Sequence, residues 1–205
     1  MSDLFSHAAE LERLPIPDAE ILYMPGLALD DEPEMLTRFL INTIHWRAEN
    51  ITVWGKTFPQ PRLVAWFGEA GMDYSYSGIH LYPNPWTPEL MKIKQKVENV
   101  TQTQFNSALL NYYRHNRDSM GFHSDDEREL GPQPIIASVS LGTSRTLVFK
   151  HKHDKALKPV RLRLESGSLL VMKGETQKNW QHGIEKETKD CGPRVNLTFR
   201  QILAA

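Results

Sequence analysis

The sequence predicts an α+β fold in which helices and hairpins come first and a β core follows. Three observations carry this prediction: two stretches with helical periodicity, an aromatic region rich in turn residues between them, and short strand patterns from residue 106 onward. No helix-length period interrupts these strands, and their spacing is typical of a small barrel or jelly roll. The strand candidates are Ser107–Arg114, Ile135–Leu141, Arg145–Lys150, Val160–Glu165, Ser168–Met172 and Arg194–Leu203.

Two amphipathic helices are expected in the first half of the chain. In the first, Glu32–Trp46, apolar residues recur at three- and four-residue steps. These positions are Met35, Leu36, Phe39, Leu40 and Thr43. The second begins at Thr87, which suits an N-cap, followed by Pro88, which suits the first helical turn. Its apolar positions are Leu90, Ile93, Val97 and Val100.

The region between the helices, residues 50–85, predicts hairpins with exposed tips. It combines many aromatic residues with prolines and glycines. A short strand is expected at 20–24, ended by Pro25-Gly26, and residues 1–19 are polar and proline-punctuated, which predicts a loosely attached arm. We therefore divide the chain into an arm, 1–19, and one domain, 20–205, with helices and hairpins over 20–105 and the β core over 106–205.

Size and composition restrict the class of protein. The 205 residues, 40% hydrophobic, suffice for one well-filled core, and a net charge of -1 gives no general support to a nucleic-acid partner. The single cysteine, Cys191, excludes an internal disulfide and a cysteine-based zinc site and fits a reducing, cytoplasmic setting. The first residues do not resemble a secretory signal, and no apolar stretch approaches the ~18 residues of a membrane span. We expect a monomer without a membrane partner.

His123-Ser124-Asp125 and the distant His182 are candidate ligands for a non-haem iron. Two histidines and one carboxylate on one face of Fe(II) leave positions open for a co-substrate and O2. On a strand, residues i and i+2 point to the same face, and His182 would have to come from another strand. Taken alone the pattern is weak, since most single histidines are structural or exposed and His123 could belong to a solvated polar turn. His151 and His153, among lysines, fit that plainer interpretation.

The segment Arg194–Arg200 predicts a strand with two different faces. Alternation places four polar residues, Arg194, Asn196, Thr198 and Arg200, opposite an apolar face that would pack in the core. The two guanidiniums would lie about 20 Å apart along six extended steps, so one arginine could hold one end of a small dicarboxylate. Both could do so only if the strand is twisted, or if the ligand lies between them with other groups filling in. Arginine suits this task because its planar fork grips a carboxylate at two points. An exposed strand with two surface arginines is the alternative.

These residues carry a resemblance to a known family. The chain from about residue 50 to residue 203 resembles the AlkB-type Fe(II)/2-oxoglutarate dioxygenases, which remove alkyl groups from nucleic-acid bases. The likeness extends to two DNA-repair branches, one acting on duplex DNA and one preferring single strands. The matching segments are Asn111–Tyr113, His123–Glu127, Pro134–Gly142, Trp180–His182 and Pro193–Arg200.

The resemblance implies a double-stranded β-helix core and a set of functional residues. Metal ligands would be His123, Asp125 and His182, and 2-oxoglutarate contacts would come from Asn111, Tyr113, Arg194, Thr198 and Arg200, with Asn196 assisting. The cofactors would be Fe(II), 2-oxoglutarate and O2. The expected reaction is demethylation of 1-methyladenine and 3-methylcytosine in DNA, coupled to decarboxylation of 2-oxoglutarate to succinate and release of formaldehyde. Alkylated RNA as substrate, or a damaged-base binder without turnover, are the alternatives.

The resemblance also assigns residues to the substrate, because a base must be flipped out of a duplex to reach buried iron. Tyr74-Ser75-Tyr76 matches the family's base-contacting turn, with Tyr76 as the stacking platform. Val53-Trp54-Gly55-Lys56 matches the finger of the duplex branch, with Trp54 filling the gap left by the base and Lys56 on a phosphate. Without the resemblance, Trp54 would be expected to pack in the hairpin's own core.

Charged residues near the iron motif could select the base that is bound. Asp126 and Glu127 could attract a cationic methylated base and accept a hydrogen bond from its exocyclic amine, or could form a solvated acidic turn. The basic residues from His151 to Arg163 could hold a phosphate backbone or form a solvated face. The finger favours the duplex branch, whereas Pro61–Leu63, Ala65-Trp66, Asp118-Ser119 and Gly174–Gln177 favour the single-strand branch. Location would be cytoplasmic, with the nucleoid or the nucleus according to the cell type.

Overall fold

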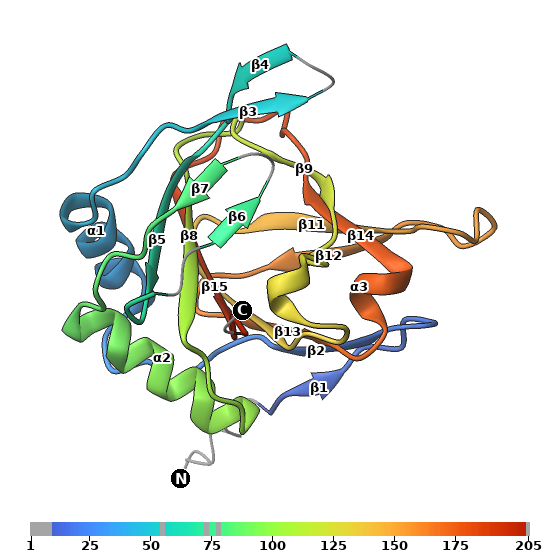
Figure 1. Cartoon of the computed structure of the whole chain (residues 1–205), viewed down its shortest axis with the longest axis horizontal. Helices are drawn as coiled ribbons and strands as arrows, with labels where there is room; N and C mark the ends of the chain where they lie inside the picture. Colours follow the sequence, from blue (N-terminus) through green and yellow to red (C-terminus); the bar gives the residue numbers. More distant parts are fainter. Residues whose placement is uncertain (1–9, 54–55, 72–73, 77–78, 204–205) are drawn as a thin grey trace, which may run out of the picture.

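Two antiparallel sheets form the body of the molecule (Figure 1). The structure, a computed structural model, describes residues 10–53, 56–71, 74–76 and 79–203, but not the side chains of 51–53, 56, 74–76 and 79–81. The larger sheet contains, in spatial order, β1 (Glu12–Arg13), β2 (Glu20–Met24), β13 (Leu169–Lys173), β10 (Ile136–Gly142), β15 (Arg194–Arg200), β8 (Ser107–Tyr113) and β5 (Leu63–Gly68). The smaller contains β12 (Val160–Leu164), β11 (Arg145–His151), β14 (Trp180–Ile184) and β9 (Met120–His123). This arrangement is consistent with the predicted jelly roll.

The larger sheet has an apolar layer on each of its faces. One layer lies between the two sheets and joins residues such as Trp66 and Met172 to Phe149 and Trp180 of the smaller sheet. The other lies between the larger sheet and two helices, α1 (Pro33–Thr43) and α2 (Pro88–Thr101), which Figure 1 shows on one side of the molecule. The central strands of the larger sheet, such as β10 and β15, are therefore buried on both faces, and their side chains alternate between the two layers, whereas the edge strand β1 is exposed.

Strand β15 shows this alternation most clearly. It lies between β10 and β8, with Asn196 opposite Ser140 on one side and Asn111 on the other. Val195, Leu197 and Phe199 point into the helix-facing layer. All seven residues of the strand are buried, so the predicted alternation is confirmed and the alternative of an exposed strand is excluded.

Helix α2 begins where predicted, whereas α1 ends at Thr43, three residues before the predicted end at Trp46, and also differs in orientation. The hydroxyl of Thr87 caps α2 by accepting a hydrogen bond from the Leu90 N–H at 3.3 Å. Helix α1 buries Leu36, Thr37 and Leu40, whereas Met35 is 64% exposed. Phe39 is 40% exposed as well, so the buried stripe is narrower than the predicted apolar face and rotated towards Thr37.

The two strands that carry the candidate histidines are absent from the strand candidates of the sequence analysis. They are β9 and β14, which are four and five residues long and include glycine and polar residues, so they show no clear alternation. Two one-turn helices, η1 (Arg128–Leu130) and α3 (Thr176–Asn179), are likewise too short to produce a periodic pattern. The remaining β-core strands lie within one or two residues of their predicted starts.

Residues 10–19 of the expected arm are attached to the body of the protein. Strand β1 pairs with β2, and Ile16 and Ala19 are buried. The indole N–H of Trp180 donates to the Pro17 carbonyl at 2.9 Å, which joins the arm to the strand that carries His182. The prediction of a loosely attached arm is therefore wrong for this part.

The predicted hairpins form two separate two-stranded sheets. The first pairs β3 (Asn50–Val53) with β4 (Lys56–Pro59), and the second pairs β6 (Tyr74–Tyr76) with β7 (Ile79–Leu81). In Figure 1 the β3–β4 hairpin projects at the top of the molecule. Within the described part of the chain, no helix combines the length and the apolar character needed to cross a membrane.

Candidate metal centre and co-substrate pocket

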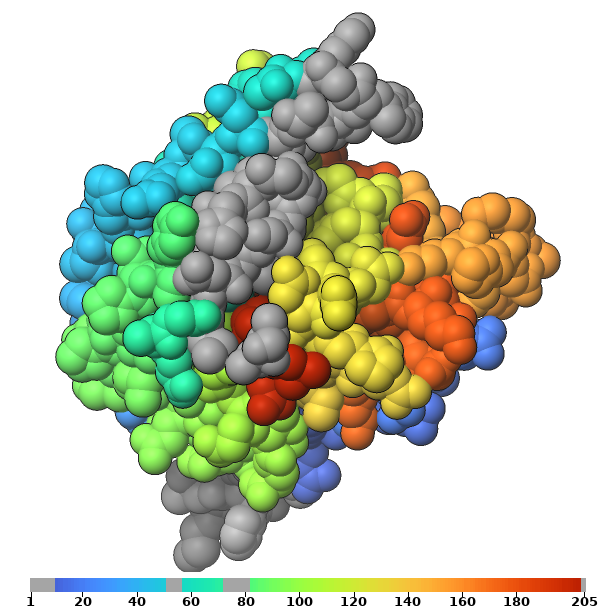
Figure 2. All heavy atoms as spheres, viewed as in Figure 1, coloured from blue at the N-terminus to red at the C-terminus, as the bar shows by residue number. Residues whose placement is uncertain are grey.

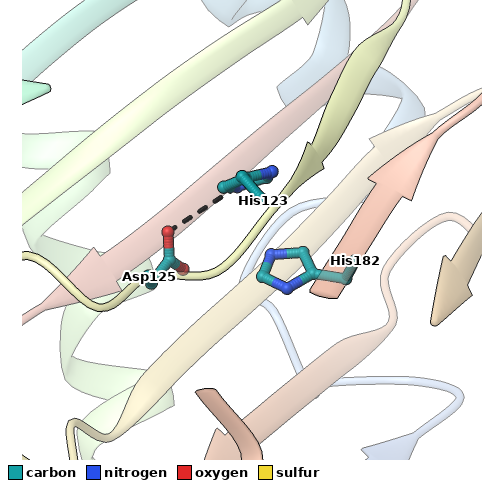
Figure 3. Close-up of side chains that lie close together, drawn as sticks. All are labelled: His123, Asp125 and His182. Carbon is teal, nitrogen blue, oxygen red and sulfur yellow. Dashed lines mark ion pairs between the residues drawn. The ribbon is translucent and has the colours of Figure 1, made fainter. Parts of the chain in front are cut away.

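His123, Asp125 and His182 converge on one point (Figure 3). One ligand atom from each lies within 4.8 Å of the others. His123 Nε2 is 3.7 Å from Asp125 Oδ1, and the two imidazole centroids are 4.4 Å apart. Three such groups on one side of a common centre fit the facial arrangement that non-haem Fe(II) requires.

The three residues reach this point from two adjacent strands and one loop. His123 ends β9 and is paired directly with His182 of β14, so the two histidines are cross-strand neighbours. Asp125 lies beyond the end of β9, in the loop that precedes η1. The expectation that His123 and Asp125 share one strand is therefore wrong, and the chain turns after His123 to bring the carboxylate to the same centre.

Hydrogen bonds outside the triad hold this loop and fix the ligand orientation. His123 Nδ1 lies 2.9 Å from the Gly121 carbonyl, which makes Nδ1 the donor and leaves Nε2 with its lone pair for a metal. The Asp125 N–H donates to Gln177 Oε1 at 2.9 Å, and the Ser124 hydroxyl donates to the Trp180 carbonyl at 3.0 Å. Helix α3 and the start of β14 thus position the loop.

The protonation states are those of a metal site. Burial alone would raise the pKa of Asp125, but the positive charge of Arg200, helped by His182 and His123, outweighs burial and lowers the pKa to about 2. Burial, together with the neighbouring His123, lowers the pKa of His182 to about 3. At neutral pH the site therefore offers a carboxylate and a neutral imidazole, which are the forms that bind metal without first losing a proton.

All nine residues predicted to bind iron or 2-oxoglutarate line one pocket between the sheets. The four polar residues of β15 face it, together with Asn111 and Tyr113 of β8. The remaining wall is largely apolar and includes Leu147, Leu170, Met172 and Ile184. The pocket thus combines convergent polar groups with an apolar wall, a combination found in small-molecule sites.

The two arginines of β15 occupy different electrostatic environments. Arg200 Nη2 lies 2.8 Å from Asp125 Oδ1, so this guanidinium adjoins the candidate metal ligands. Arg194 is buried, and its Nη2 donates to the Ser140 hydroxyl at 2.9 Å. Its Nε and Nη1 have no hydrogen-bond partner among the described residues. A buried cation with donors left over is costly unless an anion binds it, so Arg194 fits the far carboxylate of a dicarboxylate whose other end lies at the metal.

Neighbouring side chains fix the other polar groups of the pocket. The Tyr113 ring lies 5.1 Å from the Arg194 guanidinium carbon. Asn196 Nδ2 donates to the Ser138 hydroxyl at 2.7 Å, and its Oδ1 accepts from the Thr198 hydroxyl at 3.0 Å. Asn111 Oδ1 accepts from Arg62 Nε at 2.7 Å. The donor set, the ionised Asp125 and the spare donors of Arg194 together fit Fe(II) with a chelating dicarboxylate.

The predicted substrate residues are only partly described. Asp126 is exposed beside the metal loop, and Glu127 is half-buried at the N-terminal end of η1. The backbone of Lys56 begins β4, and Tyr74 and Tyr76 form the ends of β6, but their side chains lie outside the described residues, as do Trp54 and Gly55 entirely.

Three residues support the site in ways that the sequence did not predict, and for Lys152 the expected role was a phosphate contact or a solvated face. They are Gln177, Arg62 and Lys152, which contact Asp125, Asn111 and Asp126 respectively. Each acts through a contact between segments far apart in the sequence, so no local spacing indicates it. Two of these residues, Arg62 and Gln177, lie in the segments Pro61–Leu63 and Gly174–Gln177, and the match of these segments to the single-strand branch was the signal that could have indicated them.

Comparison with known proteins agrees with this geometry. Residues 20–200 match the model of the 2OG-Fe(II) oxygenase superfamily. The chain is 38% identical over 201 residues to mouse alpha-ketoglutarate-dependent dioxygenase alkB homolog 3, covering 94% of this chain and 70% of the relative. It belongs to the AlkB family of that superfamily. Human DNA oxidative demethylase ALKBH2 is another AlkB-family relative, 45% identical over 159 residues, with 75% of this chain and 61% of the relative covered.

A solved AlkB-family structure supports the fold. The structure of OsALKBH1 superposes with a TM-score of 0.65 over 93% of this chain and 99% of that chain, at 19% identity. This AlkB-family protein is thus an Fe(II)/2-oxoglutarate-dependent dioxygenase that uses Fe(II), 2-oxoglutarate and O2.

Proposed function

We propose that this dioxygenase repairs DNA directly, by oxidative removal of the methyl group from 1-methyladenine and 3-methylcytosine. The observation that carries the proposal is one pocket lined by His123, Asp125, His182 and the polar face of β15, in a chain 45% identical over 159 residues to a protein named as a DNA oxidative demethylase. Residues 20–205 would act as one catalytic domain. Its β core is not confined to residues 106–205, because β1, β2 and β5 come from the first half of the chain and complete the larger sheet.

The protein's part in the reaction is to bind, orient and exclude water. His123, Asp125 and His182 would hold Fe(II). Arg194, with Tyr113 beside it, would hold the far carboxylate of 2-oxoglutarate, and Asn111, Thr198 and Asn196 would line its path. Bound Fe(II) and 2-oxoglutarate supply the activation of O2, with succinate as the co-product and the oxidised methyl group leaving as formaldehyde.

Arg200 has a defined task in this scheme. Its ion pair with Asp125 Oδ1 keeps the carboxylate ionised and holds one oxygen in place. The apolar wall of Leu147, Leu170 and Ile184 keeps bulk water from the centre, which strengthens each electrostatic contact within it.

The hairpins would form a nucleotide-recognition lid, in which Tyr76 stacks on the flipped base and Tyr74 adjoins it. Trp54 and Gly55, which join β3 to β4 in the sequence, would enter the duplex, and Lys56 would contact a phosphate. Asp126 and Glu127 would face the exocyclic amine and the positive charge of the methylated base. The projection of the β3–β4 hairpin from the body of the molecule supports this role (Figure 1).

The test is release of formaldehyde and succinate from methylated oligonucleotides supplied with Fe(II) and 2-oxoglutarate. We expect both products in equal amounts from DNA containing 1-methyladenine, and neither from the Asp125→Ala variant. Single-stranded DNA, duplex DNA and RNA carrying the same lesion would be compared side by side. Turnover of RNA alone would replace DNA by RNA as the substrate, and tight binding without any product would indicate a damaged-base binder. Absence of both binding and turnover on every methylated oligonucleotide would refute the proposal.

A further inference from the structure

Asp126 follows the metal ligand Asp125 directly and differs from it in every contact. Asp125 is buried, whereas the side chain of Asp126 is 62% exposed. An exposed aspartate in a loop turns freely about its side-chain bonds unless a partner holds it. Asp126 has such a partner, because its Oδ2 lies 3.1 Å from Lys152 Nζ.

Lys152 is not an ordinary surface lysine. Its side chain is only 19% exposed, and its Nζ also donates to the Gln177 carbonyl at 2.7 Å. Its backbone N–H donates to the Asn179 carbonyl at 2.7 Å, so backbone and side chain are both attached to α3. The loop that begins at Lys152 projects from the molecule in Figures 1 and 2, but Lys152 itself is held at its base.

The same residue of α3 supports both carboxylates. The side-chain oxygen of Gln177 accepts from the Asp125 N–H, and its backbone oxygen accepts from Lys152, which in turn holds Asp126. The metal carboxylate and its exposed neighbour are therefore positioned by one short helix. Oδ2 of Asp126 is engaged by Lys152, and no contact of Oδ1 is recorded among the described residues, so Oδ1 can accept a further hydrogen bond.

We propose that Lys152 is a positioning residue for base selection: it orients Asp126 so that Oδ1 accepts a hydrogen bond from the exocyclic amine of a methylated adenine or cytosine. This inference rests on the proposed function. A methylated thymine presents a carbonyl oxygen in place of the amine and cannot donate to Oδ1. The contact therefore selects lesions that carry an amine against lesions that carry a carbonyl.

Orientation and charge make opposite predictions for the loss of Lys152. If Lys152 merely neutralised Asp126, its removal would expose a full negative charge and strengthen the binding of a cationic base. If Lys152 orients Asp126, its removal frees the carboxylate and weakens the contact with the amine. Stronger binding of the cationic base after removal of Lys152 would thus indicate charge neutralisation, and weaker binding would indicate orientation.

The experiment uses oligonucleotides with one 1-methyladenine or one 3-methylthymine, and the wild type, Lys152→Met and Lys152→Arg proteins. Fluorescence anisotropy on the metal-free proteins gives Kd, and formaldehyde release by the holoenzymes gives kcat/KM. We expect Lys152→Met to raise Kd and lower kcat/KM for 1-methyladenine roughly tenfold, the effect of one weakened charge-assisted hydrogen bond. For 3-methylthymine Kd should stay within about twofold, and Lys152→Arg should restore most of the preference.

Two further variants keep the result interpretable. Lys178→Met removes a lysine of α3 that is 71% exposed and pairs only with Glu175 among the contacts described for it, so it should behave as wild type. In an Asp126→Asn background, Lys152→Met should cause no further loss, because its effect passes through Asp126. An unchanged or increased preference for 1-methyladenine in Lys152→Met, or an equal loss in the Asp126→Asn background, would overturn the inference. If wild type fails to act on any methylated oligonucleotide, the proposed function fails instead.

Discussion

Replacing Arg194 with methionine should separate co-substrate binding from stability. The methionine side chain has a similar apolar stem but no charge and no donors. In the ligand-free protein Arg194 is buried, donates one hydrogen bond to Ser140 and contacts the Tyr113 ring, while Nε and Nη1 remain without hydrogen-bond partners among the described residues. The variant therefore loses two favourable contacts and one uncompensated charge.

The magnitudes of these effects can be compared. The hydrogen bond contributes about 1 kcal/mol and the contact with the aromatic ring up to about 2 kcal/mol. Burial of an unpaired cation costs several kcal/mol, and the methionine variant no longer has this cost. The two lost contacts and the removed cost nearly cancel, so the free energy of unfolding should change by less than about 1 kcal/mol. With 2-oxoglutarate bound, the variant leaves a buried carboxylate unpaired, which costs about 3 kcal/mol, or on the order of 100-fold in Kd.

A thermal-shift assay with Mn(II) and increasing 2-oxoglutarate measures both quantities. A ligand at ~100 times its Kd stabilises by about 2.7 kcal/mol, which is ~5–10 °C in Tm for a domain of this size. At the same concentration Arg194→Met should show a shift of about 2 °C or less. Arg163→Met, which changes an exposed arginine of β12, should retain the full shift. A wild-type shift in Arg194→Met, or a loss of several kcal/mol without ligand, would show that Arg194 serves the fold and not the co-substrate.

Three further predictions concern Gln177, Asp118 and Gly142. Gln177→Met removes the acceptor of the Asp125 N–H and should weaken Fe(II) affinity about 10- to 100-fold. Metal titration measures this affinity, and an unchanged value would contradict the role given to α3. The pKa of Asp118 is lowered because its hydrogen bonds with Arg114 outweigh burial, so its contribution to stability is present above the ordinary pKa of 3.8 and is lost as pH falls through the lowered value. Urea unfolding should therefore show a deficit of Asp118→Asn that is largest at pH 7 and vanishes in strong acid, and a pH-independent deficit would refute this. Gly142→Ala should lower stability by about 1–3 kcal/mol, because Gly142 has φ +86° and a Cβ would meet the Pro193 carbonyl, whereas Gly26→Ala, which meets nothing within 4 Å, should be neutral by calorimetry.

Residue patterns predicted those parts of the site that depend on one segment at a time. The alternation of Arg194–Arg200 correctly separates a pocket face from a core face, because a strand has a period of two in any sheet. The two arginines of this face have different partners, since Arg200 pairs with Asp125 and Arg194 donates to Ser140.

Contacts between distant segments were not predictable in the same way. The Arg200–Asp125 ion pair joins residues 75 positions apart, and nothing in either motif indicates it. The attachment of the arm depends on a backbone carbonyl at Pro17 and an indole N–H at Trp180, which no residue pattern records. Strands β9 and β14 escaped detection because each is stabilised by its neighbour in the sheet and not by its own composition.

The position of β15 has a consequence for the order in which the protein assembles. It is the last described strand in the sequence, yet it lies between β10 and β8, which come earlier in the chain. During synthesis each of those two strands keeps one unpaired edge until β15 has been made and inserts between them. An intermediate without β15 would lack both arginines and would expose two unpaired strand edges that can pair with other chains. A molecule that can bind 2-oxoglutarate is therefore one that has passed this aggregation-prone stage.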